Sequence, residues 1–271
     1  MRIYIETYGC SLNQADTSIM KGILKLRGHE VVESIDDAEV VIINTCTVRL
    51  DTEERMKSRI RRIRKIALSR GLKMIVAGCM ARAQPALVLS IAPESCLVSP
   101  SNIGMIAEVV ESNRRMSILG DHDKPIELLE VDGVIATVPI AEGCLGQCSY
   151  CITKFARGKL KSYREERIIN SIKKLVAKGA VEIRLTAQDA AVYGRDIRTN
   201  LPELVRKILE KVDKEYVIKA ANKNSIYVRD LFYQGKGIPH PRLSRLMLLG
   251  KLLGYATSPQ NYNYETGLRM I

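Results

Sequence analysis

Short β-rich runs alternate with amphipathic helical stretches along residues 1–115, and this alternation restricts the possible folds more than any other feature. The three units are a strand at 2–8 with a helix at 13–27, a strand at 40–44 with a helix at about 52–69, and a strand at 74–77 with a helix after Gln84. Strand–helix alternation is typical of a parallel sheet that carries helices on both faces. The sequence therefore predicts an α/β fold in which residues 1–115 form a doubly wound parallel sheet.

A cysteine comes directly after each of these three strands. Cys10, Cys46 and Cys79 stand in the segments TYGC, INTC and AGC. Because the carboxyl ends of parallel strands share one edge of the sheet, these thiols can converge although they are far apart in the chain. The alternative is that they are small buried core residues, which is how we interpret Cys96 inside its expected strand.

A second group of cysteines is far more compact. Cys144, Cys148 and Cys151 are spaced C-x3-C-x2-C in the loop GCLGQCSYC, which follows an expected strand at 134–141. An iron-sulfur cubane has four irons that each need a ligand, so three thiolates leave one iron open for another molecule. This loop therefore predicts an iron-sulfur site with an open coordination position.

Zinc is the nearest alternative to iron and sulfur at this loop. A structural zinc site needs a fourth protein ligand, and the histidines of the chain, His29, His122 and His240, all lie outside the motif. Three unrelated buried thiols are the other alternative, which the scarcity of cysteine elsewhere in the chain disfavours.

Composition and periodicity divide the chain into four parts, of which residues 1–115 are the first. Residues 116–133 are polar and irregular, which indicates a linker. Residues 134–212 resume the alternation, with strands at 134–141 and 181–186 and helices at 165–178 and 201–212. Two βα units predict the first part of a (β/α) barrel, with the cysteine loop at its active end. Residues 213–271 stay unassigned, although one apolar run fits a helix at 242–253.

The chain is basic, since 42 Lys and Arg against 30 Asp and Glu give a net charge of +12. Such a charge favours a polyanionic partner. Basic residues are most concentrated between residues 55 and 70, where apolar residues at helical spacing leave one set of cations exposed: Arg59, Arg61, Arg62, Arg64 and Lys65. We interpret this helix face as a candidate RNA-binding surface, and a merely solvated face is the alternative.

Several features bear on compartment and excluded functions. The seven cysteines are an odd number at uneven spacing, and no basic-then-apolar export signal precedes the first strand. No apolar stretch reaches the roughly 18 residues of a membrane span. We therefore expect a reduced, cytoplasmic protein without a membrane partner. The sequence has no Walker loop, H-E-x-x-H or G-x-S-x-G motif, so nucleotide hydrolysis, zinc proteolysis and serine hydrolysis have no residues to carry them.

Taken in order along the chain, the cysteine motifs resemble those of one family. The segments ETYGCSLNQADT, INTCTV, AGCMA, EGCLGQCSYC, FARGKLKSYR and LTAQDAAVYG are similar to those of the radical-SAM methylthiotransferases that modify tRNA. The similarity is greatest to the archaeal and eukaryotic branch, which acts on N6-threonylcarbamoyladenosine beside the anticodon. It covers about residues 1–212.

The resemblance implies two [4Fe-4S] clusters and S-adenosylmethionine as cofactors, with tRNA and a reductant protein as partners. By this resemblance, one cluster binds S-adenosylmethionine at its open iron and is held by Cys144, Cys148 and Cys151. The other, an auxiliary cluster that carries the sulfur to be inserted, is held by Cys10, Cys46 and Cys79.

The resemblance also extends to residues outside the cysteine motifs. Tyr150, Gln188 and Asp189 lie where contacts to S-adenosylmethionine are expected, although a polar residue after a strand is also ordinary turn chemistry. Arg157 and Arg164, in the FARGKLKSYR segment, are candidates for binding phosphate or the cofactor carboxylate, and a solvated face is again the alternative.

Members of the family continue through several more βα units and a small β-barrel RNA-binding domain, so we expect a barrel that is truncated after about residue 212. Two hypotheses follow. One is a tRNA methylthiotransferase that inserts a methylthio group at C2 of N6-threonylcarbamoyladenosine. The other is a catalytically inactive iron-sulfur or RNA-binding remnant of that family. A different radical-SAM enzyme is a third hypothesis, which the three cysteines before residue 115 disfavour.

Overall fold

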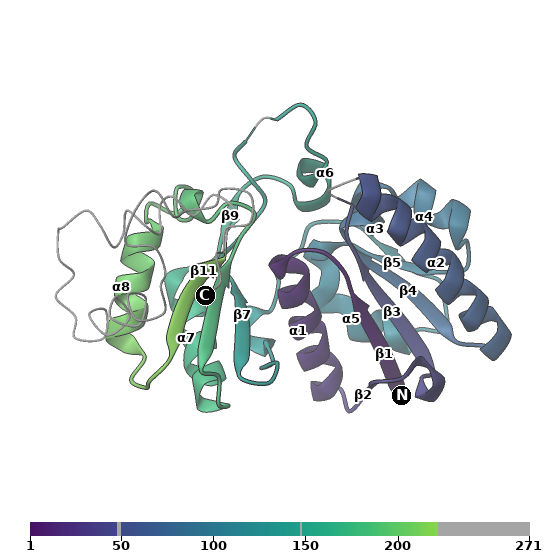
Figure 1. Ribbon diagram of the computed structural model, residues 1–271, viewed down its shortest axis with the longest axis horizontal. Helices are drawn as coiled ribbons and strands as arrows, with labels where there is room; N and C mark the ends of the chain where they lie inside the picture. The colour runs from purple at the N-terminus through teal and green to yellow at the C-terminus, as the bar shows by residue number, and fades with distance from the viewer. Residues whose placement is uncertain (48–49, 147, 222–271) are drawn as a thin grey trace.

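The computed structural model describes residues 1–47, 50–146 and 148–221, which form two parallel sheets that stand side by side (Figure 1). The first sheet has the strand order β2-β1-β3-β4-β5-β6, and all of its pairings are parallel. Its elements are β1 (Arg2–Thr7), α1 (Ser11–Leu26), β2 (Glu30–Val32), η1 (Ile35–Asp37), β3 (Val40–Thr45), α2 (Leu50–Arg70), β4 (Lys73–Gly78), α3 (Cys79–Ala83), α4 (Pro85–Ile91), β5 (Cys96–Val98), η2 (Pro100–Met105), α5 (Ile106–Glu111) and β6 (Ser117–Ile118). The predicted doubly wound parallel sheet is therefore confirmed.

Alternation of side chains along the central strands explains why both faces of the first sheet are covered. Val40 and Ile42 of β3 belong to the core that α1 and α5 share, whereas Val41 and Ile43 belong to the core beneath α2 and α4. Successive residues of a strand point to opposite faces, so a run of apolar residues buries both. The predicted core position of Cys96 in β5 is also confirmed.

The second sheet has the parallel order β11-β10-β7, and β8 and β9 form a short antiparallel ribbon beside it. Its elements are η3 (Ile126–Leu128), β7 (Ile135–Pro139), β8 (Ala141–Glu142), α6 (Thr153–Arg157), β9 (Lys161–Ser162), α7 (Glu165–Ala177), β10 (Glu182–Thr186), η4 (Ala190–Val192), α8 (Leu201–Lys211) and β11 (Val217–Ala221). Parallel strands separated by α7 and α8 fit the predicted opening of a (β/α) barrel.

Two segments differ from what periodicity alone indicates. Residues 116–133, predicted to be a linker, contribute β6 to the first sheet and the buried side chains of Lys124 and Ile126 to the junction between the sheets. β11 lies beyond residue 212, where the pattern was expected to stop, and it pairs with β10 along its whole length. β6 has only two residues, too few to show a period of two, and the residues of β11, VIKAA, do not alternate between apolar and polar. The expected helix at 242–253 lies outside the described residues.

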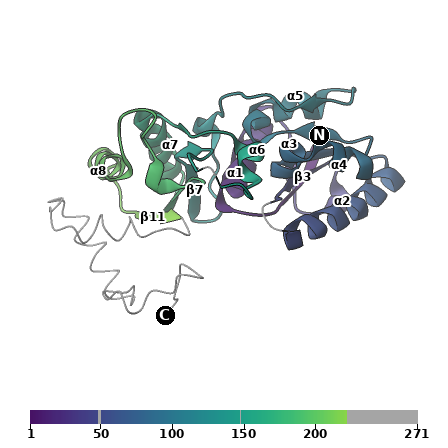
Figure 2. The same ribbon diagram turned by 90° about the horizontal axis from the view of Figure 1, so that it is seen from above.

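Helix α1 lies between the two sheets, where it contacts β7 as well as its own sheet (Figures 1 and 2). Its buried residues, among them Ile19 and Ile23, join one continuous core that also contains Val138 of β7 and Ile172 of α7. The N-terminus of α1 therefore lies close to the ends of strands from both sheets.

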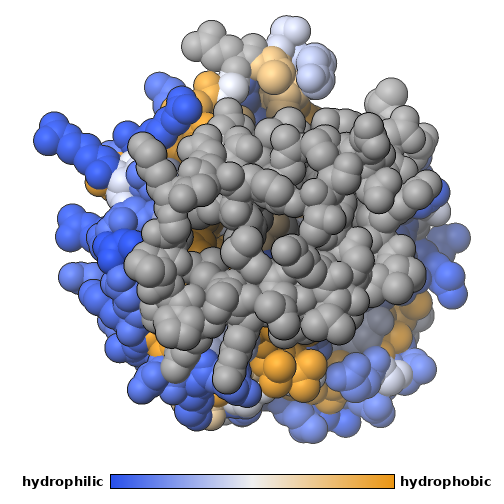
Figure 3. All heavy atoms as spheres, turned by 60° about the vertical axis from the view of Figure 1, so that its left-hand side comes forward, coloured by the Kyte–Doolittle hydropathy of each residue, from blue (hydrophilic) through white to orange (hydrophobic). Residues whose placement is uncertain are grey.

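On the face shown in Figure 3, hydrophilic side chains line most of the visible rim, and hydrophobic side chains gather in smaller groups between them. No helix in the described part of the chain is long and apolar enough to cross a membrane.

Candidate functional site

Three cysteines stand at one edge of the first sheet, as the sequence predicts. Cys10 caps the N-terminus of α1 just after β1, Cys46 follows β3, and Cys79 begins α3 directly after β4. Since β1, β3 and β4 are neighbours in the sheet, the three thiols come from adjacent strand ends. Cys46 and Cys79 are buried, and Cys10 is exposed.

Two glycines let the backbone bend tightly at this edge. Gly9 has φ +103°, and a Cβ atom there would lie 2.6 Å from the Cβ and 2.8 Å from the Sγ of Cys46. Gly78 has φ +90°, and its Cβ would lie 2.6 Å from the carbonyl oxygen of Thr45. Both positions need a residue without a side chain, because they combine a positive φ with close approach of a neighbouring strand end.

Asn13 connects the members of this group. Its Nδ2 donates hydrogen bonds to the carbonyl oxygens of Tyr8 (2.7 Å) and Thr45 (2.8 Å), which fixes the amide between the ends of β1 and β3. Its Oδ1 then accepts from the Sγ of Cys79 at 3.6 Å, and the Sγ of Cys10 lies 4.0 Å away. Sequence reasoning missed this residue, although a polar residue on the buried face of a helix is a signal that could have found it.

A charged side chain from the other half of the chain reaches the same place. Arg157, at the end of α6, is fully buried and donates from Nη2 to Oδ1 of Asn13 at 2.6 Å. Burial raises the pKa of the Cys79 thiol to about 11, and the nearby Arg157 guanidinium partly opposes this effect because it favours the thiolate. The expectation that Arg157 binds phosphate or a cofactor carboxylate is wrong for this arrangement, because its charge is enclosed by protein groups. Arg164 remains exposed.

Arg157 belongs to a buried network of four charges that joins the two halves. Arg157 contacts Asp16 at 2.8 Å and Glu142 at 2.9 Å, and Lys124 contacts the same two carboxylates at 2.6 and 2.7 Å. Burial raises the pKa of Glu142, but the two cations outweigh this and hold that pKa below its usual range. The network is internally neutral, with two cations and two anions. Sequence reasoning missed Asp16, Lys124 and Glu142, whose partners lie in distant segments.

The second cysteine group lies on a loop above the junction of the sheets, beside α6 (Figure 1). Cys144 and Cys151 are half-buried and Cys148 is exposed. A Cβ atom at Gly146 would lie 3.3 Å from the Sγ of Cys144 and 3.9 Å from that of Cys148, so the two sulfur atoms flank one glycine. The backbone N–H of Cys144 donates to the carbonyl oxygen of Gly158, which ties the loop to the end of α6.

The donor sets of both groups fit an iron-sulfur cubane. All six thiols are free of disulfides. Among residues 1–47, 50–146 and 148–221, no three His, Cys, Asp or Glu side chains are placed to share one metal ion. Cubane thiolates bind different irons, so they stand farther apart than ligands of a single ion. Three soft sulfur donors with no histidine or carboxylate among them suit iron and sulfur.

The ends of the second sheet face the first cysteine group. The hydroxyl oxygens of Ser11, next to Cys10, and Thr186, at the end of β10, are 2.5 Å apart. Gln188 and Asp189 follow β10 and are half-buried, and Oδ1 of Asp189 accepts from the backbone N–H of Ala191 at 3.0 Å. Asp189 therefore caps the N-terminus of η4. This is the turn function that the sequence indicates as the alternative to cofactor binding. Tyr150, on the cysteine loop, is 89% exposed.

The basic residues of α2 fall into two sets. Nε of Arg59 donates to Glu6 at 2.8 Å, and Arg64 forms a half-exposed pair with Glu94 at 2.7 Å, so both cations have a carboxylate partner within the protein. Burial raises the pKa of Glu6, but hydrogen bonds from Arg59 and two tyrosines outweigh it and lower that pKa. Arg61, Arg62 and Lys65 are exposed and have no ion-pair partner among the described residues. The candidate RNA-binding surface is thus reduced to these three.

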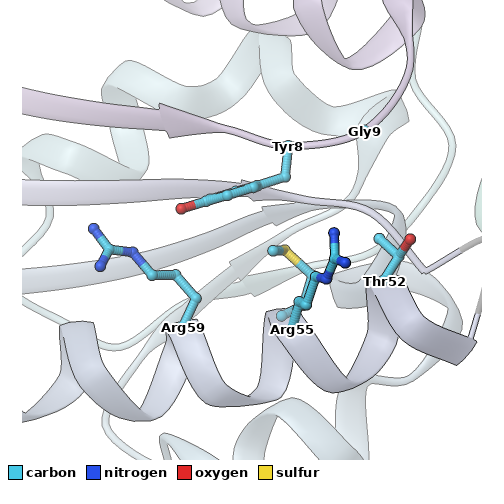
Figure 4. A pocket seen from close by; sticks show the side chains of 6 residues that line it. Tyr8, Gly9, Thr52, Arg55 and Arg59 are labelled. Atoms are coloured by element: carbon cyan, nitrogen blue, oxygen red, sulfur yellow. The ribbon is translucent and has the colours of Figure 1, made fainter.

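A hollow lies between α2 and the end of β1, next to Cys10 (Figure 4). Its lining residues are Tyr8, Gly9, Thr52, Arg55, Met56 and Arg59. The Tyr8 ring lies between β1 and α2, and Arg59 is held by Glu6, which also accepts from the Tyr8 hydroxyl at 2.9 Å. The hollow therefore has a fixed aromatic wall close to the first cysteine group.

Comparison with known proteins gives consistent matches. Residues 2–99 match the model of the uncharacterized protein family UPF0004. The chain is 40% identical over 226 residues to a probable threonylcarbamoyladenosine tRNA methylthiotransferase of Methanocaldococcus jannaschii, covering 81% of this chain and 51% of that protein. It is 31% identical over 256 residues to the human threonylcarbamoyladenosine tRNA methylthiotransferase, covering 89% of this chain and 43% of that protein.

The alignments cover most of this chain but only part of each relative. The chain spans about half the length of the curated relatives it matches. Coverage of 89% of the chain extends the similarity past residue 212, in agreement with the position of β11. Among solved structures, a radical S-adenosylmethionine methyltransferase, TsrM of Kitasatospora setae, has a TM-score of 0.50 and 12% identity, covering 77% of this chain and 51% of that one. At this identity the likeness concerns the fold.

Proposed function

We propose that this chain, which belongs to the threonylcarbamoyladenosine tRNA methylthiotransferase family, carries the two iron-sulfur sites of a radical methylthiolation reaction. The substrate is N6-threonylcarbamoyladenosine next to the anticodon of a tRNA, and C2 of the adenine receives the methylthio group. The cofactors are two [4Fe-4S] clusters and S-adenosylmethionine, and a reductant protein supplies electrons. The observation that carries the proposal is that two cysteine triples, one at the edge of the first sheet and one on the loop after β8, adjoin one junction, where α6 contacts α3.

The reaction explains why two sulfur-rich sites are useful. An aromatic C–H bond offers no acidic proton to a general base, so a radical must abstract the hydrogen. A reduced cluster with an open iron supplies the electron that cleaves S-adenosylmethionine. Cys144, Cys148 and Cys151 would hold that cluster, and Cys10, Cys46 and Cys79 would hold the one that presents sulfur. Each triple leaves one iron without a protein ligand.

The other residues of the junction would position and shield these sites. Asn13 and Arg157 would hold the thiols of Cys10 and Cys79 in a fixed position relative to α6. We propose that Gln188, which is half-buried after β10, and Tyr150, which is exposed on the loop, contact S-adenosylmethionine. Asp189 would hold the turn after β10 through its hydrogen bond to Ala191.

Anaerobic reconstitution tests the proposed activity. With iron, sulfide, S-adenosylmethionine, a reductant and tRNA containing N6-threonylcarbamoyladenosine, we expect cleavage of S-adenosylmethionine and a methylthiolated nucleoside on mass spectrometry. Cys148→Ala should abolish both products, since it removes one of three ligands at the open-iron cluster. Cys96→Ala is the matched control and should leave both unchanged, because Cys96 lies in β5. Bound clusters without any cleavage would instead support the inactive remnant.

The reduced basic surface gives a separate prediction for tRNA binding. Arg61→Glu with Arg62→Glu should weaken tRNA binding and reduce the slope of log affinity against log salt by about 1 for each tRNA phosphate that the variant no longer neutralises. Lys173→Glu with Lys174→Glu makes the same change of charge on exposed positions of α7 and serves as the control. Filter binding at several salt concentrations measures both slopes. Equal effects in the two double variants would show that α2 makes no specific contact.

A further inference from the structure

Arg157 links the two cysteine groups, because it lies six residues after Cys151 in the chain and donates to Asn13, which contacts Cys79. α6 begins two residues after Cys151 and ends at Arg157, whose neighbour Gly158 accepts a hydrogen bond from the N–H of Cys144. The same helix contacts α3, which begins at Cys79. The loop that carries the second cysteine group is therefore anchored to the site of the first.

Among the described residues, the guanidinium of Arg157 is the group of the buried network that donates to Asn13, which in turn contacts the thiols. Its positive charge acts on the thiols of Cys79 and Cys10. Through Nη2 it holds Oδ1 of Asn13, which contacts the same two sulfur atoms. Lys124 shares both carboxylate partners of Arg157 but contacts neither Asn13 nor a cysteine.

One donor of this guanidinium is unused. Nε of Arg157 is buried and has no hydrogen-bond partner within the described chain. An unsatisfied buried donor on a cation is costly, and the sulfur atoms of an iron-sulfur cluster are acceptors. The protein thus keeps a buried positive charge with an unpaired N–H on the residue that donates to Asn13, the hydrogen-bond partner of Cys79.

We infer that Arg157 is a positioning residue that sets the reduction potential of the cluster at Cys10, Cys46 and Cys79 and fixes this cluster relative to the loop of Cys144, Cys148 and Cys151. The inference rests on the proposed function, because it needs a cluster at the first group. A nearby positive charge and hydrogen bonds to sulfur stabilise the reduced form, which carries one more negative charge. Arg157 therefore raises the potential of this cluster.

The test uses the full chain with Cys144, Cys148 and Cys151 all replaced by alanine, so that only the first site can bind iron. In this background, Arg157→Gln should shift the midpoint potential of the cluster to a more negative value in an anaerobic redox titration followed by EPR. Arg157→Lys should shift it less, because the charge is kept and the fork of donors is lost. Lys124→Gln removes a cation from the same carboxylates and should leave the potential close to that of the parent.

The outcomes separate the inference from the proposed function. A parent that binds no iron would overturn the proposed cluster itself. Iron binding with equal potentials in the parent and Arg157→Gln, or with equal shifts in Arg157→Gln and Lys124→Gln, would overturn the role of Arg157 alone. If Arg157→Gln prevents folding, the variant with Arg157→Gln and Asp16→Asn keeps the network neutral. Its potential should still fall, and an unchanged potential there contradicts the inference.

Discussion

Replacing Asp16 by alanine is expected to lower the free energy of unfolding by about 3–5 kcal/mol, the usual cost of removing one partner from a buried ion pair. The carboxylate is fully buried and contacts both Arg157 and Lys124, whose side chains are 0% and 1% exposed. Without it, two buried cations share the single carboxylate of Glu142. The loss should be large because neither cation can turn to solvent, and it should affect both sheets because the network joins them.

Chemical denaturation followed by circular dichroism measures this loss. Asp36→Ala is the matched control: Asp36 pairs with Arg70 at 2.6 Å, but its side chain is 81% exposed. An exposed pair of this kind contributes about 0–1 kcal/mol. A cost for Asp16→Ala no greater than that for Asp36→Ala would mean that the buried network is not formed in solution.

Gly78→Ala should both destabilise the protein and prevent iron binding at the first cysteine group. Gly78 has φ +90° and ψ −159°, a region that other residues enter only at a cost of about 1–3 kcal/mol. An added Cβ would also lie 2.6 Å from the carbonyl oxygen and 2.8 Å from the nitrogen of Thr45, and such overpacking adds about 1–3 kcal/mol. The strand end must shift, and Cys79, the next residue, shifts with it.

The matched control for this prediction is Gly28→Ala. Gly28 follows α1 with φ +77°, but nothing lies within 4 Å of an added Cβ, so only the backbone cost of about 1–2 kcal/mol applies. Both variants carry the backbone cost of a positive φ, but only Gly78→Ala also brings a Cβ against the end of β3. Iron content and thermal unfolding of the two variants therefore separate the two effects. Full iron content in Gly78→Ala would contradict the tight packing of these strand ends.

The sheet and the position of the first cysteine group could be predicted because they depend on local pattern. Strand–helix alternation determines a parallel sheet, and in such a sheet a residue after each strand must lie at the carboxyl edge. Cys10, Cys46 and Cys79 follow from that rule alone. β6 has only two residues, too few to show a period, and the residues of β11, VIKAA, do not alternate between apolar and polar, so both strands were missed.

The charged residues of the junction could not be predicted, because their roles depend on segments that are distant in the chain. Arg157 and Asn13 are separated by 144 positions, and Lys124 and Asp16 by 108. Nothing in the sequence around Arg157 distinguishes it from an exposed arginine. Only the structure shows that its side chain is buried and paired with carboxylates. Arg59 shows the opposite error. Helix periodicity predicts that its side chain is exposed and unpaired, but in the structure it donates to Glu6 of β1.

The central claim, that this chain builds two separate iron-sulfur sites, is tested most directly by counting iron per chain after anaerobic reconstitution. The intact chain should bind about eight irons as two cubanes. The variant with Cys10, Cys46 and Cys79 replaced by alanine, and the variant with Cys144, Cys148 and Cys151 replaced, should each keep about four. A chain that never exceeds about four irons, or a single triple variant that loses all iron, would contradict two independent sites.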